Sequence, residues 1–109
     1  MSIETIKGSQ FSQAISSGVV VVEFFAEWCG PCRNVQESFE ESAETYKHAK
    51  FIKVDVDEAD EVAETFEIES LPTFMVIRDG EVELRWVGSN PTNFKAKLSQ
   101  ELEKDQPNK

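Results

Sequence analysis

The chain has 109 residues, which is enough for one domain with a buried core and too few for two. Its 21 acidic and 11 basic side chains give a formal net charge of -10. A surface of this sign repels nucleic-acid backbones and anionic lipid headgroups, so we expect neither a nucleic-acid nor a membrane partner. We expect a single domain over residues 1–109, with a frayed polar tail from about residue 105.

The N-terminal sequence has no feature of a secretory leader. Residues 1–5 lack a basic region and an apolar stretch, and no run of the chain is long and apolar enough to span a bilayer. We therefore expect a cytoplasmic protein. Thiols in that compartment stay reduced unless they are catalytic or redox-sensing, which favours a functional interpretation of the two cysteines, Cys29 and Cys32.

In chain order, strand and helix patterns alternate. Residues 2–7 are predicted to form a short edge strand, and Ser9 is a typical N-cap for a helix that ends at Gly18. Residues 19–25 are apolar on both faces except for Glu23, as in a central strand that helices cover on each side.

After the second cysteine, apolar side chains recur at steps of three and four as far as Tyr46, and glutamates take the opposite face. This spacing predicts one long amphipathic helix. His48, at its end, suits the negative end of the helix dipole and is predicted to be a capping or surface residue. Nothing in the spacing connects it to Cys29, which argues against a Cys-His hydrolase.

The next segments continue the alternation. Residues 51–56 alternate apolar side chains with Lys53 and Asp55, which predicts a strand with one polar face, and Asp57 or Ala59 then opens a short helix.

The C-terminal third predicts a hairpin and a last helix. Residues 73–78 and 81–87 flank Asp79-Gly80, a dipeptide typical of a two-residue hairpin turn, and Asn90-Pro91 is typical of a helix start. The whole order indicates an α/β fold with a mixed sheet. Ligands of such sheets bind beyond the carboxyl ends of the strands, which is where the cysteines lie.

The two cysteines could share a disulfide, supply half of a metal site, or pack as apolar thiols. A structural zinc site needs four Cys or His ligands, and His48 is the one further candidate, so we expect no metal site within one chain. A disulfide that closes so small a loop restrains the unfolded chain by only about 2 kcal/mol. Such a disulfide would stabilise the fold little, so a reversible redox role is the better interpretation.

The cysteines lie between a buried strand and the start of a helix. Unpaired backbone N–H groups and the helix dipole favour a thiolate there and account for roughly one unit of thiol acidification. Cys29, nearer the helix end, is therefore the expected nucleophile. Pro31 presets φ for the first helical turn, and Gly30 leaves the backbone open to a partner's approach.

Four segments of the chain together resemble one known family, the thioredoxins. They are Trp-Cys-Gly-Pro-Cys at 28–32, preceded by Ala26-Glu27, and downstream Leu71-Pro72-Thr73-Phe74, Asp79-Gly80-Glu81 and Val87-Gly88. The resemblance implies a three-layer α/β/α fold with a mixed central sheet of about five strands flanked by about four helices. It also implies a redox disulfide between Cys29 and Cys32.

Two charged residues match the family's proton-transfer groups. Glu23 stands where the family carries a buried aspartate, so the resemblance implies a base or relay that reaches Cys32 through a water. The alternative is a salt-bridged or rim carboxylate. Lys53 matches the lysine that faces this carboxylate from the adjacent strand, and its alternative is a solvated lysine. Burial would raise the pKa of Glu23 above its ordinary value.

The resemblance also implies a substrate-binding surface. Pro72 is expected to follow a cis peptide bond and to pack against the cysteines, with the Leu71-Pro72 backbone pairing with an extended substrate and Gly88 beside it. Trp28 is expected to be a packing lid beside Cys29. Trp86 has no such context and is expected in the core or against the hairpin.

The chain departs from the family at Glu37, where many members have a proline that kinks the long helix. We therefore expect a straighter helix here. The acidic surface at Gln36-Glu37 could shift partner preference.

The function implied is reduction of protein disulfides by dithiol exchange. The resemblance further implies no bound cofactor, reducing equivalents from NADPH through a flavoprotein thioredoxin reductase, disulfide-containing protein substrates such as peroxiredoxins, and a monomer. Two alternatives stay open. One is a disulfide oxidase or isomerase of the same fold, and the other is a non-enzymatic partner or chaperone subunit.

Overall fold

The computed structural model describes residues 3–105, in which strand β2 (Val19–Phe25) forms the middle of a five-stranded sheet. Residues 20–24 of β2 are buried because helices cover both faces of the sheet. On one side β2 pairs in parallel with β3 (Ala49–Asp55), and on the other it pairs antiparallel with β4 (Thr73–Arg78). The edges are β1 (Glu4–Thr5) and β5 (Glu81–Val87), so the sheet is mixed, in the order β1-β3-β2-β4-β5.

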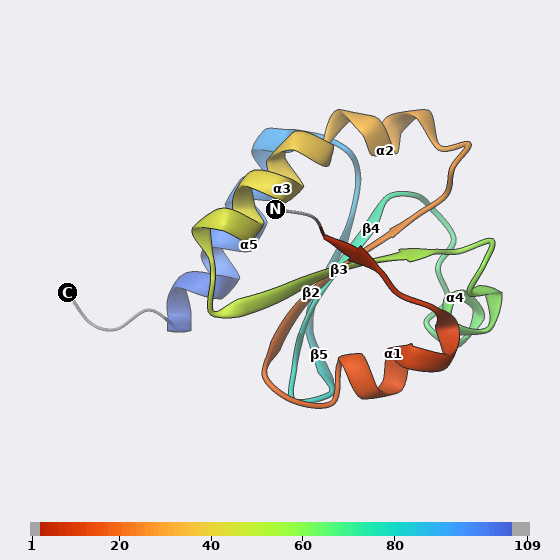
Figure 1. Cartoon of the computed structure of the whole chain (residues 1–109). Helices are drawn as coiled ribbons and strands as arrows, with labels where there is room; N and C mark the ends of the chain where they lie inside the picture. The colour runs from red at the N-terminus through yellow and green to blue at the C-terminus, as the bar shows by residue number, and fades with distance from the viewer. Residues whose placement is uncertain (1–2, 106–109) are drawn as a thin grey trace.

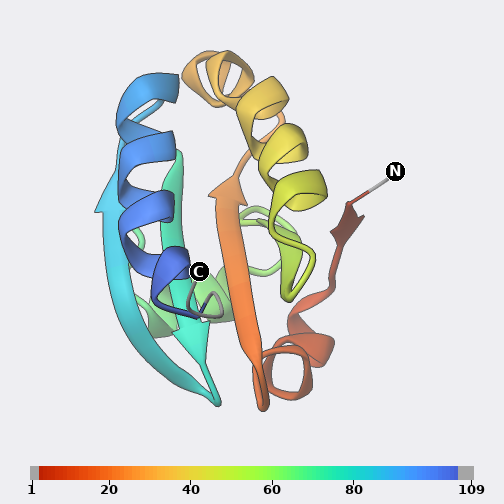
Figure 2. The same ribbon diagram turned by 90° about the vertical axis from the view of Figure 1, so that its left-hand side faces the viewer.

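The helices lie in two layers, one on each face of the sheet (Figures 1 and 2). One layer holds α2 (Gly30–Asn34), α3 (Gln36–Thr45) and α5 (Pro91–Leu102), and a short 3-10 helix, Glu103–Asp105, extends α5. The other layer holds α1 (Gly8–Ala14) and α4 (Asp60–Thr65). Within residues 3–105, no helix is long and apolar enough to cross a membrane.

Each layer has its own core against the sheet. The core under α3 and α5 is built on aromatic rings, with Phe39, Phe74 and Phe94 fully buried and the Phe74 and Phe94 rings 4.8 Å apart. The core under α1 and α4 includes Phe11 and Phe24. The α/β/α layering that the resemblance implies is confirmed.

The helix expected to run unbroken from Cys32 to Tyr46 is divided into α2 and α3, and the expectation of a straighter helix is wrong. The interruption is a turn at Val35, whose φ of -109° and ψ of 0° depart from ideal helical values, although Glu37 stands where the family has proline. At the break, the Gln36 side-chain amide donates to the Cys32 carbonyl (3.4 Å). That oxygen is the one an unbroken helix would pair with the Gln36 backbone N–H. The described chain therefore has five α-helices rather than about four.

The expected start and end of the first helix are also wrong. α1 begins at Gly8 with Lys7 as its N-cap, because the Gln10 side chain accepts the Lys7 backbone N–H (2.9 Å). It ends at Ala14, before Gly18, whose positive φ of 75° instead serves the turn into β2.

Two polar residues differ from what the sequence pattern predicts. Asp55 is buried at the end of β3, where its carboxylate accepts the backbone N–H of Asp57 (2.9 Å). Asp105, expected to begin a frayed tail, is bound by Arg78 and by His48. Residues 106–109 of that tail lie outside the described residues.

Candidate active site

The two cysteines lie at the carboxyl end of β2 and form a disulfide. Cys29 is the N-cap of α2, and its sulfur accepts the backbone N–H of Cys32 (3.2 Å). Pro31 lies in the first turn, where a proline sacrifices no intrahelical hydrogen bond. A backbone donor to sulfur at a helix start favours a thiolate once the disulfide is reduced, and the sulfur it favours is that of Cys29.

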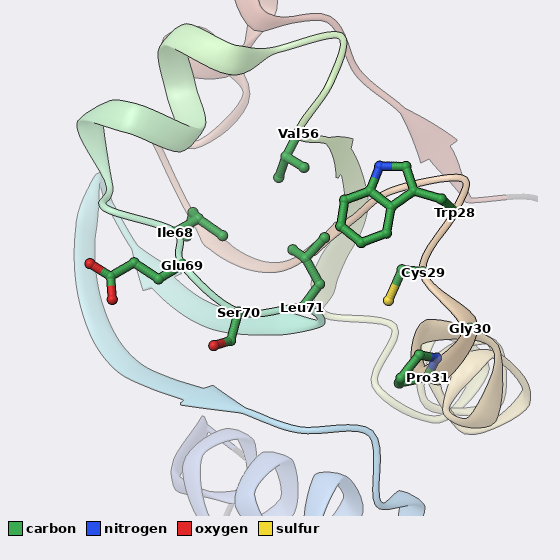
Figure 3. A pocket seen from close by; sticks show the side chains of 9 residues that line it. All are labelled: Trp28, Cys29, Gly30, Pro31, Val56, Ile68, Glu69, Ser70 and Leu71. Atoms are coloured by element: carbon green, nitrogen blue, oxygen red, sulfur yellow. The ribbon is translucent and has the colours of Figure 1, made fainter.

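An open cavity of about 490 Å³ adjoins Cys29 (Figure 3). Its lining is mostly apolar and comes from three segments of the chain: Trp28, Cys29, Gly30, Pro31, Val56, Ile68, Glu69, Ser70 and Leu71. Gly30 leaves open space where a side chain would stand, and the Cys29 sulfur points into the cavity. Both cysteines are 4% exposed, so exchange with another disulfide has to occur from the cavity side.

Trp28 overhangs the cavity and is held in place from one side. The residue is 70% exposed, and its indole Nε1 donates to the carboxylate of Asp57 (2.8 Å). The opposite wall is the segment before β4, where the Leu71-Pro72 peptide bond is cis and Pro72 is buried. The Pro72 carbonyl accepts the backbone N–H of Gly88 (3.0 Å), which places Gly88 next to Pro72.

Glu23 lies within the sheet and is 0% exposed. Its two carboxylate oxygens each accept from the same donor, Gln36 Nε2, at 2.9 Å. Gln36 Oε1 accepts in turn from Lys53 Nζ (3.0 Å). Lys53 stands opposite Glu23 in the β2–β3 register, and its ammonium lies 4.4 Å from the centre of the Phe25 ring. The expected facing of Glu23 and Lys53 is present, with an amide between them.

Burial governs the protonation of this carboxyl group. Loss of hydration raises the pKa of Glu23 from 4.5 to about 7. The hydrogen bond from Gln36 and the positive charge of Lys53 work in the opposite direction, and the carboxylate of Glu40 on α3 adds a smaller upward contribution. A carboxyl group with this pKa can both accept and release a proton near neutral pH.

A second, smaller cavity of about 200 Å³ lies on the other side of the disulfide. Its lining includes both cysteines as well as Gln36 and Lys53, the two residues in contact around Glu23. A water molecule in this space would have sulfur on one side and the Glu23 network on the other. Glu23 itself does not line this cavity, and its connection to it is through Gln36.

Sequence reasoning missed two residues of this arrangement, Gln36 and Asp57. The sequence predicts an acidic outer surface at Gln36, although on the expected long helix its position four residues after Cys32 places both on one face. Asp57 lies 29 residues from Trp28, and no local pattern links them.

The remaining candidates have structural roles. His48 is exposed after α3, as predicted, and contacts Asp105 (3.1 Å). Trp86 is buried and stacks on Phe74, with ring centres 5.4 Å apart, which confirms its place in the core. Within residues 3–105, no group of three or more His, Cys, Asp or Glu side chains is arranged to hold a metal ion.

A disulfide that staples so short a loop contributes little to stability, yet this one adjoins an apolar cavity and has a backbone donor on one sulfur. Such an arrangement works by exchanging electrons with other disulfides. The class defined by the fold and the site is therefore that of the thiol-disulfide oxidoreductases.

Comparison with known proteins narrows the class to one family. The sequence matches the thioredoxin family over residues 2–104. Thioredoxin-2 of Saccharomyces cerevisiae is 42% identical over 84% of this chain and 89% of its own length. Thioredoxin 1 of Plasmodium falciparum is 44% identical over 80% and 85%, respectively. The chain belongs to the thioredoxin family and is a protein-disulfide reductase.

Solved structures agree. A Plasmodium falciparum thioredoxin superposes with a TM-score of 0.86 at 39% identity and covers 92% of this chain and 99% of its own. Another structure matches 90% of this chain and 93% of its own, at 28% identity and with a TM-score of 0.81. That structure concerns thiol resolution in yeast mitochondrial 1-Cys peroxiredoxin through glutathione and thioredoxin systems. These similarities support the reductase and give no sign of the oxidising or non-enzymatic alternatives.

Proposed function

We propose that Cys29 is the attacking thiol and Cys32 the resolving thiol of this reductase. The Cys29 thiolate attacks one sulfur of a substrate disulfide, the substrate S–S bond breaks, and the other substrate sulfur leaves as a thiolate that takes up a proton. A mixed disulfide then joins Cys29 to the substrate. The observation that carries this assignment is the hydrogen bond from the Cys32 backbone N–H to Cys29 Sγ, because it favours negative charge on Cys29.

Resolution of the mixed disulfide needs Cys32 as a thiolate. We propose that Glu23 accepts the Cys32 proton through water, on the side of the disulfide where the smaller cavity is lined by Cys32 and by Gln36, the residue that binds Glu23. The Cys32 thiolate then attacks Cys29 Sγ, the mixed disulfide breaks, and the reduced substrate leaves. The buried position of Glu23 supports this role, because its pKa of about 7 leaves much of it ready to accept a proton at neutral pH.

Substrates would bind in the larger cavity beside Cys29. The exposed Trp28 and the side chain of Leu71 offer apolar contact, and the backbone at Leu71-Pro72, to which Gly88 is hydrogen-bonded, offers pairing to an extended segment around a disulfide. On the cysteine side of the cavity, Gly30 and Pro31 present little side-chain bulk to an approaching substrate. Protein substrates of the peroxiredoxin type fit this proposal, and the solved structure concerned with a 1-Cys peroxiredoxin supports it.

The protein would receive its electrons from outside. We propose that NADPH, through a flavoprotein thioredoxin reductase, returns the Cys29–Cys32 disulfide to the dithiol, and that the protein binds no cofactor of its own. We further propose that it acts as a cytoplasmic monomer, as a single domain.

The test is reduction of insulin disulfides with NADPH and a thioredoxin reductase. We expect turnover with the unmodified chain and none with Cys29→Ser, with NADPH consumed in proportion to thiols formed. Failure of the unmodified chain to consume NADPH would contradict the proposed electron source. If dithiothreitol then restores insulin reduction, the reductase assignment stands and another electron donor is required.

A further inference from the structure

Gln36 holds three groups of the site at once. Its amide nitrogen donates to both oxygens of Glu23 at 2.9 Å and to the Cys32 carbonyl at 3.4 Å, and its amide oxygen accepts from Lys53 at 3.0 Å. It is also the first residue of α3, directly after the break at Val35. Gln36 therefore connects the central sheet to the helix that carries Cys32.

The direction of this amide is fixed by its neighbours. An ammonium group can only donate and a carboxylate can only accept, so Lys53 requires the amide oxygen and Glu23 requires the amide nitrogen. Reversing the amide would place two donors together at Lys53 and two acceptors together at Glu23. Each hydrogen bond also polarises the next, so the positive charge of Lys53 strengthens the bond that Gln36 donates to Glu23.

We propose that Gln36 is a positioning residue for disulfide exchange, acting as the bridge through which Lys53 sustains the Glu23 carboxylate beside Cys32. The proposal rests on the proposed role of Glu23 as proton acceptor. It adds a residue to that role, because without the bridge the carboxyl group would lose a close hydrogen-bond donor inside the sheet.

The charges around Glu23 give the sign of the effect. Lys53 faces it from β3 and Glu40 acts on it from α3, while Phe74, its register partner on β4, is uncharged. A donor to a carboxylate favours the charged form, so loss of the Gln36 donor raises the pKa of Glu23 above about 7. The carboxyl group would then be mostly protonated at neutral pH and could not take the Cys32 proton.

The test replaces Gln36 by leucine, which keeps the volume and removes the amide. Carboxyl NMR of oxidised Gln36→Leu should show the pKa of Glu23 raised by about one unit, and the ionised fraction at pH 7 then falls about five-fold. The resolving step, measured by single-turnover release of substrate thiol, should slow by the same factor at pH 7 and recover at higher pH. Gln13→Leu, on the exposed face of α1, is the matched control and should change neither quantity.

The bridge predicts a second result, which a purely structural role for Gln36 would not. Lys53→Met should raise the pKa of Glu23 in the unmodified chain and raise it less in the Gln36→Leu background, because the path from the ammonium is already broken. Gln36→Ala, with its high helix propensity, repeats the experiment if the leucine variant folds poorly.

The outcomes separate the bridge from the proposed function. The bridge is overturned if the pKa of Glu23 is unchanged in Gln36→Leu, or if Gln36→Leu and Lys53→Met have strictly additive effects on that pKa. The role of Glu23 as proton acceptor is then tested by Glu23→Gln alone. A raised pKa with an unchanged resolving rate overturns both the positioning role and the assignment of Glu23 as base. Cys29 chemistry, tested by insulin reduction, survives either result.

Discussion

Glu23 and Lys53 stand directly opposite each other on β2 and β3, and their side chains are connected through the amide of Gln36. This relationship places a titratable group inside the sheet with positive charge close by but not in contact. Burial then has the larger effect, which is why the pKa of Glu23 is raised rather than lowered.

The first prediction concerns catalysis by this carboxyl group. Glu23→Gln keeps the shape and removes the base, so the resolving step should slow about ten-fold or more at pH 7.5. The rate in the unmodified protein should rise with pH through about 7, following ionisation of Glu23, and the variant should lack that inflection. Stopped-flow release of substrate thiol measures both. Glu37→Gln, exposed on the same helical layer, is the control, and equal rates in all three proteins would contradict the role of Glu23.

The second prediction concerns stability. The pKa of Glu23 is raised on folding, so the folded state binds the proton more tightly and stability falls as pH rises from 4.5 to about 7. The difference corresponds to about 3 kcal/mol. Glu23→Gln should therefore be more stable than the unmodified protein at pH 8, by up to about this amount, with a much smaller difference at pH 4. Urea unfolding at both pH values measures it, and a stability difference independent of pH would contradict the raised pKa.

The third prediction concerns the break between α2 and α3. Because α3 begins at Gln36, Glu37 lies in its first turn, where a proline interrupts no hydrogen bond within the helix. Glu37→Pro should cost less than about 1 kcal/mol of unfolding free energy, whereas Glu41→Pro, exposed in the middle of α3, should cost about 3 kcal/mol or more. Chemical denaturation compares them. Equal costs would mean that the helix runs through Val35.

The fourth prediction concerns the C-terminal end of α5. The Glu101 side chain is 6% exposed and is paired with Arg78, whose Nη2 also donates to the Glu101 carbonyl (2.8 Å). Arg78→Met leaves this carboxylate with Lys104 (3.2 Å) as its remaining cation, removes the donor to the Glu101 carbonyl and breaks the ion pair with Asp105, so it should cost about 2 kcal/mol. Lys95→Met removes the exposed contact with Glu41 at 3.8 Å and should cost less than about 0.5 kcal/mol. A cost for Arg78→Met as small as that control would contradict the account.

Much of the fold could be predicted because local patterns and tertiary structure agree. The apolar run 19–25, the turn at Asp79-Gly80 and the Asn90-Pro91 helix start all appear where the sequence places them. The sequence predicts too late a start for the first helix, because Ser9 is a typical N-cap residue whereas the observed cap is made by the Gln10 side chain.

The site could be predicted less completely. The positions of Cys29 and Cys32 follow from a contiguous motif, and the pairing of Glu23 with Lys53 follows from family resemblance. Gln36 could not be recognised as their link, because amide geometry depends on how β2, β3 and α3 pack together. The burial of Asp55 escaped the alternation rule for the same reason, since both faces of β3 are covered.

The most direct test of the central claim is to trap the mixed disulfide. Cys32→Ser should accumulate a covalent one-to-one adduct with a disulfide substrate, and peptide mapping should place the bond at Cys29. Cys29→Ser should form no such adduct at neutral pH. An adduct located at Cys32, or turnover by Cys29→Ser, would contradict the assignment of Cys29 as the thiol that attacks.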